Sequence, residues 1–278
     1  MIVSTLVPPL LAGLVDDAAV FPPGNAAVAE AVAGHRVHRA HWYAPLVGPL
    51  LLPPDDLAAA GALVAGGESL EVGIVGHRAA VARTPVPPGV VVRQVEAPVA
   101  KRGEDPLPGL KDLLALFDRV RMYAEIPLTG GLLPALDEVA AARARGVDVL
   151  PKFRTGGLAA ELFPTPVELA GVVCACRDRG LPFKLTAGLH RAVRHTDPET
   201  GFAHHGFLNI LAAALVAADG GRPGAVTDVL AGVDPLPLVE AVRARLDRDR
   251  PLWTGYGSCS IAEPLHDLLT FGLLTEPE

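Results

Sequence analysis

Eight short apolar runs, each followed by a turn and a helix-like segment, constrain the fold of this chain most. The runs are largely continuous rather than alternating, which is typical of strands covered on both faces and hence of a parallel sheet. The predicted strands span residues 14–21, 42–52, 70–75, 90–95, 121–126, 147–153, 182–186 and 251–256. Apolar residues recur at helical spacing between them, in residues 26–40, 55–65, 77–83, 109–119, 132–145 and 165–179.

Eight strands alternating with helices over about 250 residues predict a (β/α)8, or TIM, barrel better than an open doubly wound sheet. Nucleotide-binding open sheets usually carry a G-x-G-x-x-G sequence after the first strand or a G-x-x-x-x-G-K-[ST] sequence, and this chain has neither. We therefore expect residues 1–278 to form a single barrel domain.

The seventh repeat is longer than the others. About 65 residues separate the last two predicted strands, whereas an ordinary connection needs about half that number. Three helix-like segments fill the interval, at residues 204–218, 223–231 and 235–246. The sequence predicts a helical elaboration at about residues 189–249 that would cover the barrel mouth.

One helix has clear end signals. Thr165 and Glu168 have the spacing of a capping box, Pro166 stands at the first helical position, and Gly180 follows the last turn.

Charge and composition exclude several classes of protein. The formal net charge is −7 and no block is rich in Lys or Arg, which argues against binding to nucleic acid. No run of 18 apolar residues occurs, and the apolar opening lacks a basic start and leads directly into Asp16 and Asp17. We expect a cytoplasmic protein without a membrane partner. The three cysteines have no framework spacing, so neither disulfides nor a zinc site are predicted.

Lysine is scarce, and its positions are informative. Only four of the 24 basic residues are lysines. Lys101 and Lys111 lie in a polar stretch and are interpreted as surface residues. Lys152 and Lys184 lie near the C-terminal ends of the sixth and seventh predicted strands, where barrels of this type place reacting groups.

The strand period of two puts Lys152 and Arg154 on one face, and Lys184 and Thr186 on one face. If these faces point inward, two amines and a guanidinium converge with no obligatory carboxylate between them. Each cation would then lower the pKa of its neighbours, and burial would lower the pKa of a lysine further. A lysine with such a pKa can attack a carbonyl to form a Schiff base. The alternative is that both lysines extend to solvent.

Glycine-bearing turns follow the last three predicted strands. They contain Thr155, Gly156, Gly157, Gly188, Gly257 and Ser258. Glycine lets a backbone approach an anion, and amides at a helix start can bind phosphate or carboxylate oxygens. The alternative is that these are ordinary loop residues.

These motifs resemble those of the deoxyribose-phosphate aldolases. The sequence Lys152-Phe-Arg-Thr-Gly156 resembles the family's K-x-x-T-G on strand six, Phe183-Lys-Leu-Thr-Ala-Gly188 its F-K-P-A-G-G-I on strand seven, and Gly257-Ser-Cys-Ser260 its G-A-S-S turn. The resemblance implies a class I aldolase with Lys152 as the Schiff-base lysine and Lys184 as the amine that tunes it. It also implies phosphate contacts at Gly188, Gly257 and Ser258. The family's catalytic Asp on a middle strand has no clear match.

A Schiff-base lyase also needs a group that moves protons. Carboxylates at predicted strand ends are the first candidates: Asp16 or Asp17, of which alternation turns only one inward and Asp16 is favoured, together with Glu96 and Glu125. Glu125 lies in an apolar run, so it is either the acid or the counter-ion of a lysine.

Histidines are the second group of candidates, because four of the nine occur between residues 189 and 206. We select His190 as a candidate proton carrier, and His205 and Asn209 as candidate substrate contacts. No metal-ligand spacing occurs, and metal binding stays an open alternative. His35, His38 and His41 are interpreted as helix surface and strand start, without a role.

The first hypothesis is thus a cofactor-independent lyase or aldolase. It would use Lys152, Lys184, Asp16, Glu125 and His190 on a small carbonyl compound that carries a phosphate or carboxylate. The second is a phosphosugar isomerase or phosphoribosyl-type enzyme with the lysines as anion clamps. The third is a non-catalytic small-molecule-binding barrel. The sequence leaves a monomer and a homo-oligomer both open.

Overall fold

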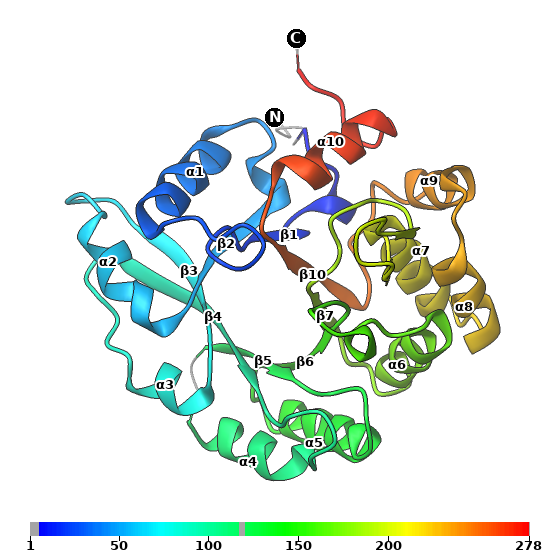
Figure 1. Ribbon diagram of the computed structural model, residues 1–278, viewed down its shortest axis with the longest axis horizontal. Helices are drawn as coiled ribbons and strands as arrows, with labels where there is room; N and C mark the ends of the chain where they lie inside the picture. The colour runs from blue at the N-terminus through cyan, green and yellow to red at the C-terminus, as the bar shows by residue number, and fades with distance from the viewer. Residues whose placement is uncertain (1–5, 117–119, 278) are drawn as a thin grey trace.

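The chain forms the closed barrel that the alternation of its segments predicts. The computed structural model describes residues 6–116 and 120–277. Eight parallel strands close in the order β1-β10-β7-β6-β5-β4-β3-β2, and helices surround them (Figure 1). The barrel strands are β1 (Val15–Asp17), β2 (Val47–Leu52), β3 (Leu70–Val75), β4 (Val90–Pro98), β5 (Arg121–Glu125), β6 (Val149–Arg154), β7 (Phe183–Thr186) and β10 (Trp253–Ser258). The (β/α)8 prediction is confirmed.

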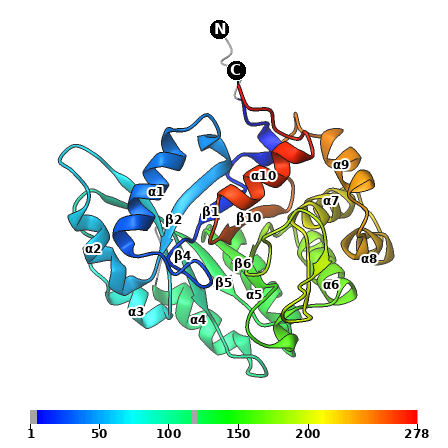
Figure 2. The same cartoon turned by 45° about the horizontal axis from the view of Figure 1, so that its top comes forward.

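Helices surround the strands, as the tilted view of Figure 2 shows, and all but the last, α10, correspond to predicted segments. The helices are α1 (Val28–Ala40), α2 (Leu57–Ala62), α3 (Arg78–Arg83), α4 (Pro106–Leu116), α5 (Leu132–Ala144), α6 (Pro166–Asp178), α7 (Phe207–Ala218), α8 (Pro223–Ala231), α9 (Pro235–Arg243) and α10 (Ala262–Thr270). The end of the predicted helix 109–119 lies outside the described residues. Thr165 and Glu168 form the predicted capping box at the start of α6, because each side chain accepts from the other's backbone N–H.

Three strands have bounds that differ from the prediction and affect the site. The predicted strand 251–256 is β10, which extends to Ser258, so that Gly257 and Ser258 lie within the strand instead of in a turn after it. The predicted strand 14–21 keeps only Val15–Asp17, because the chain turns away at Ala18, whose N–H donates to Ser258 O at 2.7 Å. The predicted strand 90–95 extends to Pro98, so that Glu96 lies within β4 instead of after it. Its continuation pairs in register with β5, with Glu96 opposite Tyr123.

The long seventh connection contains the three predicted helices and a hairpin that was not predicted. The hairpin consists of β8 (His195–Thr196) and β9 (Ala203–His204). Helix α7 therefore begins at Phe207 instead of residue 204, because His204 pairs with His195. The preceding Gly206 packs so closely on the backbone of Val193 that a Cβ there would lie 2.4 Å away.

Most of the apolar core lies between the outer faces of the strands and the helices. The start of β10 is fixed by Arg250, whose guanidinium donates to Leu10 O at 2.6 Å and to Trp253 O at 2.7 Å. Burial lowers the pKa of Arg250 to about 10. Within the described ranges, no helix is long and apolar enough to span a bilayer.

Candidate active site

The two strand-end lysines are neighbours inside the barrel. Lys152 on β6 is in register with Lys184 on β7, and each is only 2% exposed. The alternative that both side chains extend to solvent is therefore wrong. Both amines lie in the barrel interior, surrounded by side chains of the opposite charge.

Glu96 lies between the two amines and binds both. Its Oε2 lies 2.8 Å from Lys152 Nζ, and its Oε1 accepts a hydrogen bond from Lys184. Lys184 also donates to Asp16 on β1. Lys152 lies 2.9 Å from Glu125 Oε2, and Arg154 donates to Glu125 Oε1 at 3.0 Å. We call this alternating row the ion chain: Asp16, Lys184, Glu96, Lys152, Glu125 and Arg154.

The ion chain overturns the expectation that no carboxylate separates the amines. Three carboxylates alternate with the three cations, so their formal charges balance. Burial disfavours the charged amine, but the negative charges of Glu125 and Glu96 outweigh it and raise the pKa of Lys152. Asp16 and Glu96 likewise outweigh burial and raise the pKa of Lys184. Both lysines are therefore ammonium ions at neutral pH, contrary to the predicted lowering.

The three carboxylates differ in how they hold protons. Burial opposes ionisation of Glu96, but two ammonium groups lower its pKa to about 2. Burial also opposes ionisation of Glu125, and Lys152 and Arg154 outweigh it and lower the pKa of Glu125. Burial raises the pKa of Asp16 in spite of its contact with Lys184. Asp16 is thus the acidic group of the ion chain most inclined to carry a proton.

Neighbouring strands support these positions. Gln94, two residues before Glu96 on the same face of β4, donates to Asp16 Oδ2 at 2.7 Å and to Glu96 Oε1 at 2.8 Å. The Tyr123 ring lies 4.8 Å below Lys184 Nζ, a distance that permits a cation–π contact. A Cβ at Gly48 on β2 would lie 1.9 Å from Asp16 Oδ1, so glycine is needed there to accommodate the carboxylate.

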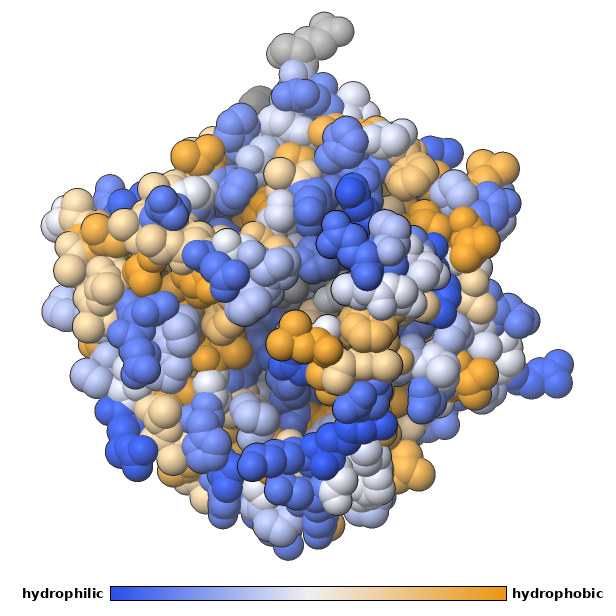
Figure 3. Space-filling model, viewed as in Figure 1, coloured by the Kyte–Doolittle hydropathy of each residue, from blue (hydrophilic) through white to orange (hydrophobic). Residues whose placement is uncertain are grey.

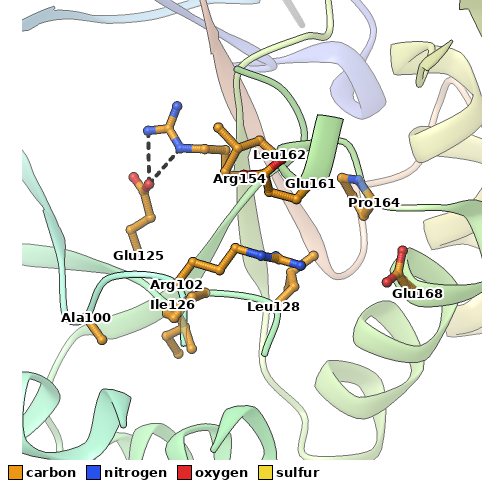
Figure 4. Close-up of a pocket in the computed structure, with 11 residues that line it drawn as sticks. Ala100, Arg102, Glu125, Ile126, Leu128, Arg154, Glu161, Leu162, Pro164 and Glu168 are labelled. Atoms are coloured by element: carbon orange, nitrogen blue, oxygen red, sulfur yellow. Dashed lines mark hydrogen bonds and ion pairs between the residues drawn. The ribbon is translucent and has the colours of Figure 1, made fainter. Parts of the chain in front are cut away.

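A pocket of about 140 Å³ opens at the C-terminal ends of β4, β5 and β6. Glu125 and Arg154 form part of its wall, with Arg102, Leu128 and Pro164 from the adjoining loops (Figure 4). Figure 3 views this end of the barrel and shows that the face is hollowed near its centre. Since Glu125 also contacts Lys152, the pocket leads from solvent to the ion chain.

The glycine-bearing turns lie against each other on another side of the mouth. A Cβ at Gly156 would lie 2.9 Å from Gly188 Cα, and Gly188 has φ +77°. Thr155 Oγ1 donates to Ala187 O at 2.6 Å. Close packing of these turns therefore accounts for both glycines.

The other predicted anion contacts have partners within the protein or lie at strand ends. A Cβ at Gly157 would contact Leu162, and one at Gly257 would contact Leu51. Ser258 Oγ donates to Ser260 O, and Thr186 is half-buried at the end of β7. Anion binding at these positions stays a prediction.

The predicted histidine and asparagine contacts lie outside the ion chain. His190 Nδ1 lies 3.1 Å from Glu263 Oε2 on α10. His205 is buried, with Nε2 2.8 Å from Pro164 O, and burial lowers its pKa to about 4. Asn209 is also buried. Its Oδ1 accepts from the backbone N–H of Arg194, and its Nδ2 donates to the carbonyls of Val229 and Gly232. Among the described residues, no group of His, Cys, Asp or Glu is arranged to hold a metal ion.

The structure corrects the interpretation of His35 as a residue on the helix surface. It is only 3% exposed, and its Nδ1 lies 3.1 Å from Asp17 Oδ2. Asp16 and Asp17 therefore point to opposite sides of β1, one into the barrel and one toward α1. The short strand is fixed on both faces by carboxylate contacts.

Sequence reasoning considered Glu96 but did not select it, and it missed Gln94, Tyr123 and Arg102. A signal for Gln94 was present, because Gln94 and Glu96 are polar residues two apart in β4 and so share one face of the strand. Comparisons of the chain with protein-family models, curated proteins and solved structures found no match.

Proposed function

We propose that this protein is a lyase or aldolase that forms a Schiff base between Lys152 and a small carbonyl compound carrying a carboxylate or phosphate. One observation carries the proposal. The Lys152 amine lies inside the barrel between Glu96 and Glu125, at 2.8 and 2.9 Å, and Glu125 forms part of the pocket wall. An amine, two groups able to move protons and a route from solvent thus meet at one point.

The energetics of burial also favour a functional role. Replacing a buried ion pair by apolar residues of similar volume is often neutral or stabilising, so stability alone does not require such a network. The ion chain contains six ionisable groups, and Lys152, Lys184 and Glu96 are almost fully buried. Clusters of this kind, with shifted pKa values beside a cleft, are typical of active sites.

The reaction can be written with the groups present. Lys152 transfers a proton to Glu125 or Glu96, and its lone pair forms a bond to the carbonyl carbon. The carbonyl oxygen gains two protons and leaves as water, which gives an iminium ion. The flanking carboxylates stabilise the positive nitrogen as they stabilise the ammonium group. The bond between the α and β carbons then breaks: its electron pair forms an enamine, the proton of the β-hydroxyl passes to a carboxylate of the ion chain, and the β carbon leaves as a carbonyl compound. The enamine regains a proton at its α carbon, and water hydrolyses the resulting iminium to free Lys152. Asp16 is placed to return protons through Lys184 and Glu96.

Two arginines in the pocket wall support an anionic substrate. Arg154 and Arg102 both line the pocket (Figure 4), and guanidinium groups suit bidentate contact with carboxylate or phosphate. Arg154 now binds Glu125. An anionic substrate would compete for Arg154 and so leave Glu125 more able to take the proton of Lys152. Binding would thereby prepare the amine for attack.

Borohydride reduction in the presence of a panel of small aldehydes, ketones, keto acids and phosphorylated sugars tests the proposal. We expect a substrate-sized mass increase on the peptide that contains Lys152. Lys101 and Lys111, which are exposed, serve as internal controls and should stay unmodified under limiting conditions. Lys152→Met should abolish the adduct. Absence of an adduct across the panel at neutral and alkaline pH would refute covalent catalysis.

A second candidate function is a non-covalent enzyme in which the lysines act as anion clamps. The raised pKa of both amines favours this alternative, because ammonium ions bind anions but do not attack carbonyls. This function predicts saturable binding of phosphorylated sugars that Lys152→Met weakens, with no product of borohydride reduction.

A further inference from the structure

A second group of reactive side chains lies at the mouth, outside the ion chain. Cys259 follows β10, and its Sγ lies 3.9 Å from His190 Nδ1. The same nitrogen lies 3.1 Å from Glu263 Oε2 on α10. One imidazole nitrogen therefore faces both the sulfur and the carboxylate, so a protonated ring held by Glu263 places its positive charge beside the thiol. We call these three residues the thiol cluster.

The imidazole beside Cys259 is readily protonated. The hydrogen bond to Cys259 is the largest contribution that raises the pKa of His190, and Glu263 adds to it, so the imidazole is more readily protonated. An imidazolium ion beside a sulfur stabilises its negative charge.

The thiol cluster is open to small reagents, in contrast to the other cysteines. Cys259 is half-buried, and the side chains of His190 and Glu263 are 28% and 41% exposed. Cys174 and Cys176 are buried in α6, at 4% and 0% exposure, and burial raises the pKa of both. The chain thus contains two unreactive thiols as internal references for Cys259.

We propose that Cys259 is a modification site that undergoes thiol–disulfide exchange with small disulfides, promoted by the positive charge of the His190 ring that Glu263 holds beside it. Cys259 releases its proton to solvent, and the thiolate attacks one sulfur of the disulfide and forms a mixed disulfide. The old sulfur–sulfur bond breaks, and the released thiolate takes a proton from solvent. No further oxidant is needed. The inference does not depend on the Schiff-base proposal.

The site lies where an adduct would affect the barrel mouth. A Cβ at Gly24, in the segment between β1 and α1, would lie 3.0 Å from Cys259 Cβ. Gly257, two residues before Cys259, is in register with Asp16. A mixed disulfide would therefore occupy the space where the segments after β1, β7 and β10 meet.

Reaction of the folded protein with the uncharged disulfide dithiodipyridine tests the proposal. We expect one thiol to react per chain at neutral pH, faster than glutathione, and peptide mapping to place the adduct on Cys259. His190→Ala should slow this reaction about three- to tenfold, because thiolate fraction falls while intrinsic nucleophilicity rises. Glu263→Gln should slow it by a smaller factor.

The matched control is His266→Ala, which removes an exposed imidazole from the same helix and should leave the rate unchanged. Cys174 and Cys176 should stay unreactive in every variant until urea is added, which verifies that the fold is intact. The proposal is overturned if folded His190→Ala reacts as fast as the wild type. It is equally overturned if Cys259 reacts no faster than glutathione.

Discussion

Two sectors of the barrel mouth look alike in the sequence but differ in the structure. The sector formed by β4, β5 and β6 contains the pocket, where Glu125 and Arg154 continue the ion chain to the surface. In the sector formed by β6, β7 and β10, the turns of Gly156 and Gly188 are packed against each other. Glycine-rich turns thus mark close contact between loops as readily as an anion site. The carboxylates beside the pocket are therefore better markers of a functional site in this barrel than the glycine-rich turns.

The largest expected effect is that of Glu96→Ala. This variant tests whether the sector formed by β4, β5 and β6 depends for its stability on the carboxylate that Lys152 and Lys184 share. The substitution leaves two buried ammonium groups without their common partner, and we expect a loss of about 3–5 kcal/mol in the free energy of unfolding. Urea denaturation measures it. The control is Glu71→Ala, which breaks the exposed pair with Arg93 and should cost less than about 1 kcal/mol. Equal losses in the two variants would mean that the buried contacts of Glu96 contribute no more to stability than an exposed ion pair.

Acid titration gives a somewhat smaller effect in the same sector. The pKa of Glu96 is about 2 in the folded chain, below the value of about 4.3 for an unfolded glutamate. A lowered pKa gives stability that is present above the unfolded value and lost as the pH falls toward 2. We expect this group to contribute about 3 kcal/mol to that loss. Glu96→Gln should have a flatter profile of unfolding free energy against pH, and parallel profiles would contradict the account.

The smallest expected effect lies in the sector formed by β6, β7 and β10, where the glycine-bearing turns pack together. Gly188→Ala places a Cβ in a left-handed backbone conformation, 2.9 Å from Thr155 O, and should cost about 1–3 kcal/mol. Thermal unfolding checks this value against Gly130→Ala, where a Cβ would meet nothing within 4 Å. If Gly188→Ala leaves stability unchanged but weakens binding of inorganic phosphate, the turn is an anion site and the two sectors are not distinct in the way we describe.

The fold could be predicted further than the site. Continuous apolar runs and helical spacing are local patterns, and they gave the barrel and most of its elements. The register of Lys152 with Lys184 also follows from local patterns, because both lie near the ends of neighbouring strands. The ion chain does not, since Lys184 contacts Asp16 and Glu96 across sequence separations of 168 and 88 residues.

Two specific errors explain what was missed. The predicted end of β4 at residue 95 placed Glu96 in a loop, whereas the strand extends to Pro98. Counting the inward cations without their partners then predicted lowered lysine pKa values. The charge balance of a buried site depends on every strand that faces it, and Glu125 and Asp16 raise the lysine pKa values together with Glu96.

The central claim is that Lys152 is a buried ammonium ion in the resting protein and must lose a proton before it attacks a carbonyl. The most direct test is the initial rate of borohydride-trapped adduct on Lys152 with an uncharged carbonyl compound, which does not compete with Glu125 for Arg154. The rate is measured by peptide mass between about pH 6 and pH 9, with the reactivity of the carbonyl compound toward a model amine as reference. Without an anion to free Glu125, the amine must lose its proton to solvent, and the raised pKa of Lys152 predicts a rate that rises about tenfold per pH unit throughout this range. A rate that levels off at or below neutral pH would show a free amine in the resting protein and would contradict the account.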